Sequence, residues 1–146
     1  MKILALLVAY LSLTIGPGAL QTSDALKGIV GSYLEIHALL AADKIDGVKA
    51  AAAAIATKAE SMGPQGAAIA KSAKAVGAAP DLKTTREAFG QLSDAVIAAA
   101  EGGSMKDLGV KRAFCPMVNR SWLQKDEKIR NPYYGQSMLE CGEIKK

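Results

Sequence analysis

The stretch DGVKAAAAAIATKAESMG, residues 46–63, decides the fold class of this chain. Apolar residues recur in it at alternating steps of four and three, at Val48, Ala52, Ile55, Ala59 and Met62. This spacing places them on one face of an α-helix. Alanine fills most other positions, and it is the best helix former because it loses no side-chain entropy and hides no polar group. Gly63 and Pro64 then end the pattern, glycine as a C-terminal cap and proline as a restart, so the stretch predicts a helix over residues 46–62.

The same rhythm recurs in three further segments, which predict helices over residues 23–42, 65–77 and 81–101. The first of these helices has Ser23 or Asp24 as its predicted N-cap. Its apolar stripe runs through Leu26, Val30, Tyr33, His37 and Leu40. Short turns join the four segments, and alanine at facing positions would let the helices pack closely. The sequence therefore predicts a mainly α fold, an antiparallel four-helix bundle.

The helical periodicity is lost towards the C-terminus, which divides the single expected domain into two parts. Residues 20–105 are assigned to the helical bundle and residues 106–146 to a Cys- and Met-containing C-terminal segment of the same domain. VKRAFCPM indicates a short extended piece that ends at Pro116, because proline cannot donate to a strand ladder. We expect the segment to be irregular and to pack across the bundle through Trp122, Leu123, Ile129 and Tyr133.

The N-terminus, MKILALLVAYLSLTIGPGAL, has the pattern of a secretory signal peptide over residues 1–19. Lys2 supplies the positive region, Ile3 to Ile15 are uncharged, and small residues follow as a cleavage zone. A membrane-spanning helix needs about 20 apolar residues, which this run does not reach. The pattern predicts an exported protein, most simply periplasmic, with no stable membrane anchor after cleavage.

Charge is uneven along the chain, which has a net charge of +4 at pH 7. Residues 21–105 hold eight Lys and Arg against nine Asp and Glu, whereas residues 106–146 hold nine against five. The basic balance could indicate nucleic acid, but no Arg-rich run with interleaved aromatic residues is present. Solvated surface lysines account better for the charge, and no nucleic-acid partner is expected.

The only two cysteines of the chain, Cys115 and Cys141, each lie close to a methionine in sequence, Met117 and Met138. Thiolates and thioethers are soft donors that favour Cu(I) over hard cations. A Cys-x-Met spacing on a strand puts both side chains on one face, and so does Met-x-x-Cys on a helical turn. The four side chains are therefore candidate ligands of one copper site. No Cys-x-x-Cys occurs, so a thioredoxin-like site or a zinc ribbon is poorly supported.

A disulfide is an equally weighted alternative for the same two cysteines. Exported proteins with two cysteines normally pair them. Closing the interval between Cys115 and Cys141 would stabilise the fold by about 3–4 kcal/mol in the chain-entropy model, and the methionines would then only pack. The residues alone leave both interpretations open.

The C-terminal motifs resemble a known family. FCPM, followed by WLQKDEKIRNPYYGQSMLECGEI, is similar to the end of a bacterial family of unknown function, and the resemblance extends upstream through TTREAFGQLSDAVI. Members occur as small exported proteins or are fused to periplasmic adaptor subunits of RND-type heavy-metal efflux pumps. The resemblance implies a helical domain in the cell envelope, associated with copper or silver handling, with an efflux-system component as partner.

His37, the only histidine, falls on the apolar stripe of the first helix. A partly buried imidazole with one hydrogen bond is the favoured interpretation, and a weak alternative is a metal ligand beside the cysteines. No acidic or nucleophilic neighbour accompanies it, and no phosphate-binding glycine loop occurs, so we expect no enzyme. The two functional hypotheses are an exported copper-binding accessory domain for heavy-metal handling and a disulfide-stapled, non-catalytic interaction domain of the envelope.

Overall fold

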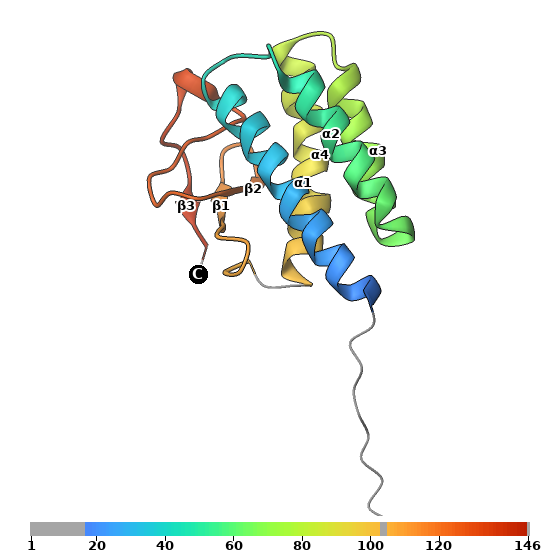
Figure 1. Cartoon of the computed structure of the whole chain (residues 1–146). Helices are drawn as coiled ribbons and strands as arrows, with labels where there is room; N and C mark the ends of the chain where they lie inside the picture. The colour runs from blue at the N-terminus through green and yellow to red at the C-terminus, as the bar shows by residue number, and fades with distance from the viewer. Residues whose placement is uncertain (1–16, 103–104, 146) are drawn as a thin grey trace, which may run out of the picture.

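Four helices form the body of the protein in a computed structural model, which describes residues 17–102 and 105–145. They are α1 (Pro17–Ala41), α2 (Val48–Ser61), α3 (Ala67–Ala78) and α4 (Leu82–Glu101), and a short 3-10 helix, Gly63–Gly66, joins α2 to α3. Consecutive helices run in opposite directions and pack pairwise (Figure 1). The predicted mainly α fold is therefore confirmed.

Helix α1 starts earlier than the sequence predicted. It begins at Pro17, so Ser23 and Asp24 lie inside the helix and the predicted N-cap there is wrong. Proline is favoured at the first helical position, and the good helix formers that follow carry the helix past the two polar residues. The predicted signal peptide covers residues 1–19, of which 1–16 lie outside the described residues. No helix among the described residues is long and apolar enough to cross a membrane.

The core extends from the bundle into the C-terminal segment. Its largest fully buried side chains come from all four helices and from one strand, and they include Trp122, Tyr33, Phe89, Ile29, Ile36, Leu40, Ile55, Ile69, Leu92 and Leu123. Ala52, Ala59 and Ala73 are also fully buried, which allows α2 and α3 to approach closely. The rings of Tyr33 and Phe89 stack with centroids 4.9 Å apart, and Phe89 in turn contacts Tyr133. This aromatic cluster joins the helices to the C-terminal segment.

The C-terminal segment contains a small sheet that the sequence did not predict. Strands β1 (Lys111–Cys115), β2 (Arg120–Gln124) and β3 (Glu143–Ile144) pair antiparallel in the order β2-β1-β3. The sheet lies beside α1 and α4, away from α3 (Figure 1). The sequence predicts extended chain at β1 and at the exit from Gly142, where β3 lies, but neither β2 nor the pairing of the three strands. The strands are too short to show a period-two pattern, and β3 pairs with β1 only through a contact distant in sequence.

Candidate functional site

Cys115 and Cys141 lie side by side at one end of this sheet, where the central strand β1 ends and the chain enters β3. Cys115 is the last residue of β1 and is fully buried, whereas Cys141 is half-buried and lies two residues before β3. The pairing of Phe114 with Glu143 brings the two cysteines together. No S–S bond joins them, but their Sγ atoms lie 2.6 Å apart, which is closer than two unbonded sulfur atoms approach. An S–S bond is about 2.05 Å long, so only a small movement would separate this pair from a disulfide.

The environment of Cys115 favours its thiolate form. Burial raises the pKa of its thiol, but hydrogen bonds from the Cys141 thiol, from the backbone N–H groups of Val118 and Met117, and from Asn131 outweigh burial and lower it. Donors that point at a charged sulfur stabilise that charge. The sequence could not identify these donors, because two of them belong to the backbone of the hairpin turn.

Cys141 has the opposite character. Its hydrogen bond to Cys115 and its partial burial raise the pKa of its thiol, and the nearby charge of Cys115 adds to this effect. The lowered pKa of Cys115 and the raised pKa of Cys141 have a common cause: the Cys141 thiol donates a hydrogen bond that stabilises negative charge on the Cys115 sulfur. The two thiols are therefore unequal: the buried Cys115 is the more acidic and the half-buried Cys141 the less acidic.

Asn131 holds the two cysteine-bearing segments together. Its fully buried side chain donates to the Cys141 carbonyl at 2.8 Å and accepts from the backbone N–H groups of Tyr133 and Tyr134 at 2.8 and 3.2 Å. Its own N–H donates to the Leu139 carbonyl at 2.7 Å. In the sequence, an Asn-Pro dipeptide such as Asn131-Pro132 indicates only a turn, so the contact of Asn131 with Cys141 could not be predicted.

The two methionines occupy different places from those predicted. β1 ends at Cys115, so Met117 lies in the hairpin turn, where it is 64% exposed, and not on a strand face with the cysteine. Pro116 ends the strand because it supplies no N–H. The short 3-10 helix Gly135–Ser137 ends before Met138, which is linked to Cys141 by a turn in which the Cys141 N–H donates to the Met138 carbonyl at 3.1 Å. The predicted helical turn therefore stops before the Met-x-x-Cys pair.

His37 is buried and joins the first helix to the C-terminal segment through one hydrogen bond. It is 6% exposed, and its Nε2 donates to the Arg130 carbonyl at 2.8 Å. Burial lowers the pKa of its imidazole to about 4, which outweighs that hydrogen bond. Within residues 17–102 and 105–145, no group of three or more His, Cys, Asp and Glu side chains is placed to hold a metal ion, so His37 does not join the cysteines.

Other groups fasten the C-terminal segment to the bundle without the cysteines. Arg86 of α4 donates to the carbonyls of Pro132 and Leu40, each at 2.8 Å, and pairs with Asp43. Gln136 donates its side-chain amide to the Ala41 carbonyl at 2.8 Å. The segment is therefore anchored to the end of α1 and the start of α4 by contacts that do not need a disulfide between Cys115 and Cys141.

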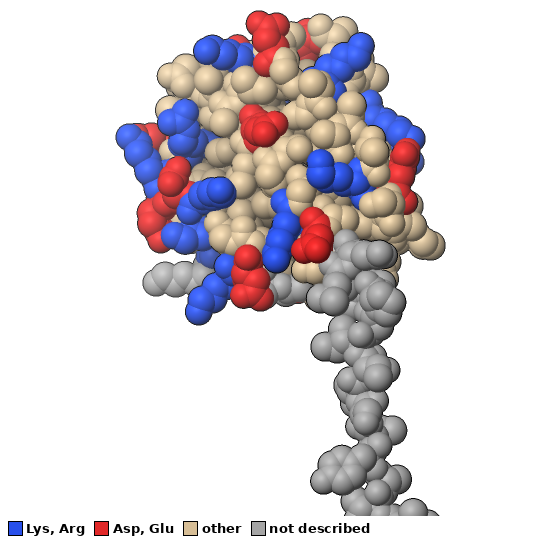
Figure 2. Space-filling model, viewed as in Figure 1, with Lys and Arg blue, Asp and Glu red and all other residues tan. Residues whose placement is uncertain are grey.

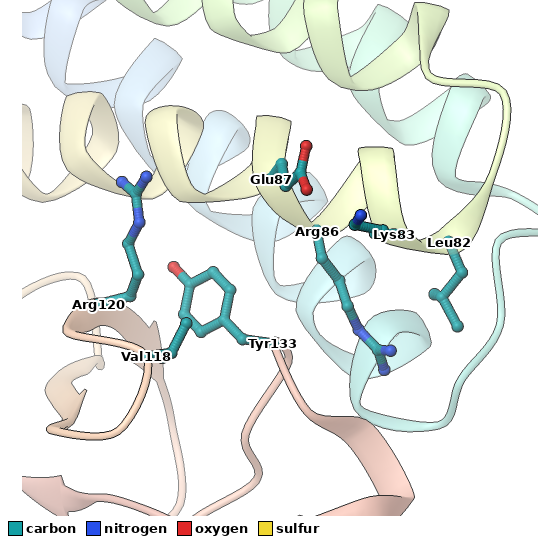
Figure 3. A pocket seen from close by; sticks show the side chains of 7 residues that line it. All are labelled: Leu82, Lys83, Arg86, Glu87, Val118, Arg120 and Tyr133. Atoms are coloured by element: carbon teal, nitrogen blue, oxygen red, sulfur yellow. The ribbon is translucent and has the colours of Figure 1, made fainter.

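A pocket of about 630 Å³ opens between α4 and the hairpin turn (Figure 3). It is lined by Leu82, Lys83, Arg86, Glu87, Val118, Arg120 and Tyr133. Two of its polar side chains have partners in the protein: Arg120 pairs with Asp94 at 3.0 Å, and the Tyr133 hydroxyl donates to the Ser121 carbonyl at 2.7 Å. The Arg86 guanidinium points away from Arg120 (Figure 3). The ion pair of Arg120 in β2 with Asp94 in α4 thus joins the sheet to this helix at the pocket.

The surface charge is mixed in sign on the face drawn in Figure 2, where Lys and Arg side chains alternate with Asp and Glu. Ion pairs among the described residues include Lys74–Glu60, Arg112–Glu101 and Lys128–Glu140. On this face the basic excess of the chain is therefore dispersed among acidic groups.

Comparison with protein-family models, with curated proteins and with solved structures finds no match for this chain. The resemblance to the exported family therefore rests on the quoted motifs alone.

Proposed function

We propose that the protein binds Cu(I) through the thiolates of Cys115 and Cys141, with the thioethers of Met117 and Met138 as additional donors. The observation that carries this proposal is that the fold brings two sulfurs together, 2.6 Å apart, and that one of them has an environment that favours the thiolate. The two sulfurs would move apart to admit the ion between them. Metal binding requires deprotonated cysteine, so an anion-stabilised sulfur is a prepared ligand. Soft thiolate and thioether donors favour Cu(I) over hard cations.

The exposure of Met117 supports a role beyond packing. A large apolar side chain that is 64% exposed contributes little to a core, whereas Met62 and Met105 pack against the core. Met117 follows Cys115 by two residues, and Met138 is tied to Cys141 by the turn hydrogen bond. Both thioethers therefore start close along the chain to the thiols that they would assist.

Competition with a Cu(I) chelator tests the proposal. Reduced protein should withdraw copper from the chelator, and replacing both cysteines by serine should abolish this. The double variant Met117→Leu, Met138→Leu should bind more weakly by about tenfold because it loses both thioethers, and it should keep its fold because Met117 is exposed and leucine can replace the half-buried Met138 in packing. The control is Met62→Leu with Met105→Leu, which removes the same number of sulfurs from the core and should leave copper affinity unchanged.

Two outcomes would contradict parts of this proposal. Unchanged competition in the Met117, Met138 variant would remove the methionines from the site. No competition by the wild-type protein would leave the alternative function, a disulfide-stapled interaction domain, which the closeness of the two sulfurs also favours.

The proposed setting is the periplasm, with a component of a heavy-metal efflux system as partner. This part rests on the signal-peptide pattern of residues 1–19 and on the resemblance of the C-terminal motifs. Mass spectrometry of the protein from cells should find a new N-terminus near Leu20. An intact Met1 on the mature pool would reject export.

A further inference from the structure

The two sulfurs of the cysteine pair differ in access as well as in charge. Cys115 is fully buried at the end of β1, whereas Cys141 is half-buried and reaches the surface. Of the two residues, only Cys141 offers an external molecule any exposed surface without a change in structure. In a disulfide of this pair, only one of the two sulfurs would be open to attack.

We propose that the Cys115–Cys141 pair is a thiol–disulfide exchange site, which an external thiol enters at Cys141 and from which Cys115 is the leaving group. The substrate class is a small thiol or dithiol as reductant and the corresponding disulfide as oxidant. This inference goes beyond copper binding and does not depend on it.

The reductive step begins when an external thiolate attacks Cys141 Sγ in the oxidised protein. The Cys115–Cys141 S–S bond breaks, its electron pair goes to Cys115 Sγ, and a mixed disulfide forms at Cys141. A second external thiolate then attacks the external sulfur, which releases an external disulfide and the Cys141 thiolate, and solvent supplies a proton to that sulfur. The protein gains two electrons and the external thiols lose two. The reverse sequence oxidises the pair.

The position of Cys115 supports its role as leaving group. Cys115 is fully buried at the end of β1, whereas Cys141 lies in the chain before β3 and is partly exposed. Attack from outside is therefore directed to Cys141, and the S–S bond then breaks towards Cys115.

The surrounding structure supports exchange without unfolding. Arg86, Gln136 and His37 hold the C-terminal segment to the bundle through contacts that involve neither sulfur of the pair. Breaking the S–S bond would therefore leave the C-terminal segment attached to the bundle. If the disulfide were the main attachment of the segment, breaking it would instead detach the segment.

Trapping the mixed disulfide with glutathione as the probe tests the direction of exchange. Oxidised wild-type protein in metal-free buffer is mixed with reduced glutathione, quenched with acid at successive times, alkylated and digested with trypsin. The two cysteines fall in separate peptides, residues 113–120 and 131–145. We expect glutathione on the 131–145 peptide and the alkyl group on the 113–120 peptide, in an excess of about tenfold over the opposite pattern. Equal or reversed labelling, or a disulfide that glutathione does not open in the folded protein, would overturn the proposal.

A matched pair of variants checks the difference in access separately. In Cys115→Ser the remaining Cys141 should react with glutathione disulfide faster than Cys115 does in Cys141→Ser, and the two rates should converge in urea. Equal rates in the folded proteins would also overturn the proposal. Copper is absent throughout, so failure of copper binding would leave these results unaffected.

Discussion

His37 is a buried, neutral imidazole, and this makes the stability of the fold sensitive to acid. Burial lowers the pKa of His37 from 6.5 to about 4 in the folded protein. Between these values the unfolded chain binds a proton at His37 and the folded protein does not, so the free energy of unfolding falls as pH drops through this window. At about 1.4 kcal/mol per pKa unit, the loss approaches about 3 kcal/mol. Urea denaturation at neutral pH and near pH 4.5 measures it.

His37→Gln is the matched control for this prediction. The glutamine amide can still donate to the Arg130 carbonyl but does not titrate in this range. The variant should keep most of its stability at neutral pH and lose much less between pH 6.5 and 4. A wild-type protein and variant with the same pH dependence would mean that another group causes the acid sensitivity.

At the scale of elements, Gly142 is the residue that lets β3 dock beside Cys141. Its φ of +142° disfavours a side chain, and a Cβ there would lie 2.8 Å from the Trp122 ring and 3.0 Å from the Phe114 carbonyl. Gly142→Ala should therefore push β3 from β1, draw Cys141 away from Cys115, and cost about 1–3 kcal/mol. Chemical denaturation and a thiol count after mild oxidation measure both effects.

Gly31→Ala in α1 is the control for that substitution. A Cβ at Gly31 meets nothing within 4 Å, and alanine is favoured over glycine inside a helix, so this variant should gain about 0.5–1 kcal/mol and oxidise normally. Wild-type stability and oxidation in Gly142→Ala would show that β3 docking tolerates a side chain.

The elements differ in how far the sequence could predict them. The helices follow from local patterns: Asp81, expected at the start of the fourth helix, caps it by accepting from the Thr84 N–H at 2.8 Å. Strands β2 and β3 depend on pairing with β1, and Trp122 in β2 gave no alternation that would identify a strand. The methionine placement failed for a related reason, since β1 stops at Cys115. Backbone donors and distant carbonyl acceptors, such as those of Arg86, are set by tertiary structure and leave no local signal.

For the whole molecule, the anchoring of the C-terminal segment decides what the redox state of the cysteines does to the fold. Arg86, Gln136 and His37 attach this segment to α1 and α4 whether or not the sulfurs are bonded. We therefore expect reduced protein to stay folded, with unchanged far-UV circular dichroism and with the fluorescence emission of a buried tryptophan at Trp122.

Oxidation should add stability to this already folded state. A bond between Cys115 and Cys141 would close the intervening loop and restrict the unfolded chain, which raises the free energy of unfolding by about 3–4 kcal/mol. Urea denaturation of oxidised and reduced protein measures the difference. The double variant Cys115→Ser, Cys141→Ser should have the free energy of unfolding of the reduced protein in both oxidising and reducing buffer. Loss of the Trp122 signal on reduction would instead make the disulfide a condition of folding. A reduced protein that stays folded but is as stable as the oxidised one would mean that the loop is already restricted in the unfolded chain.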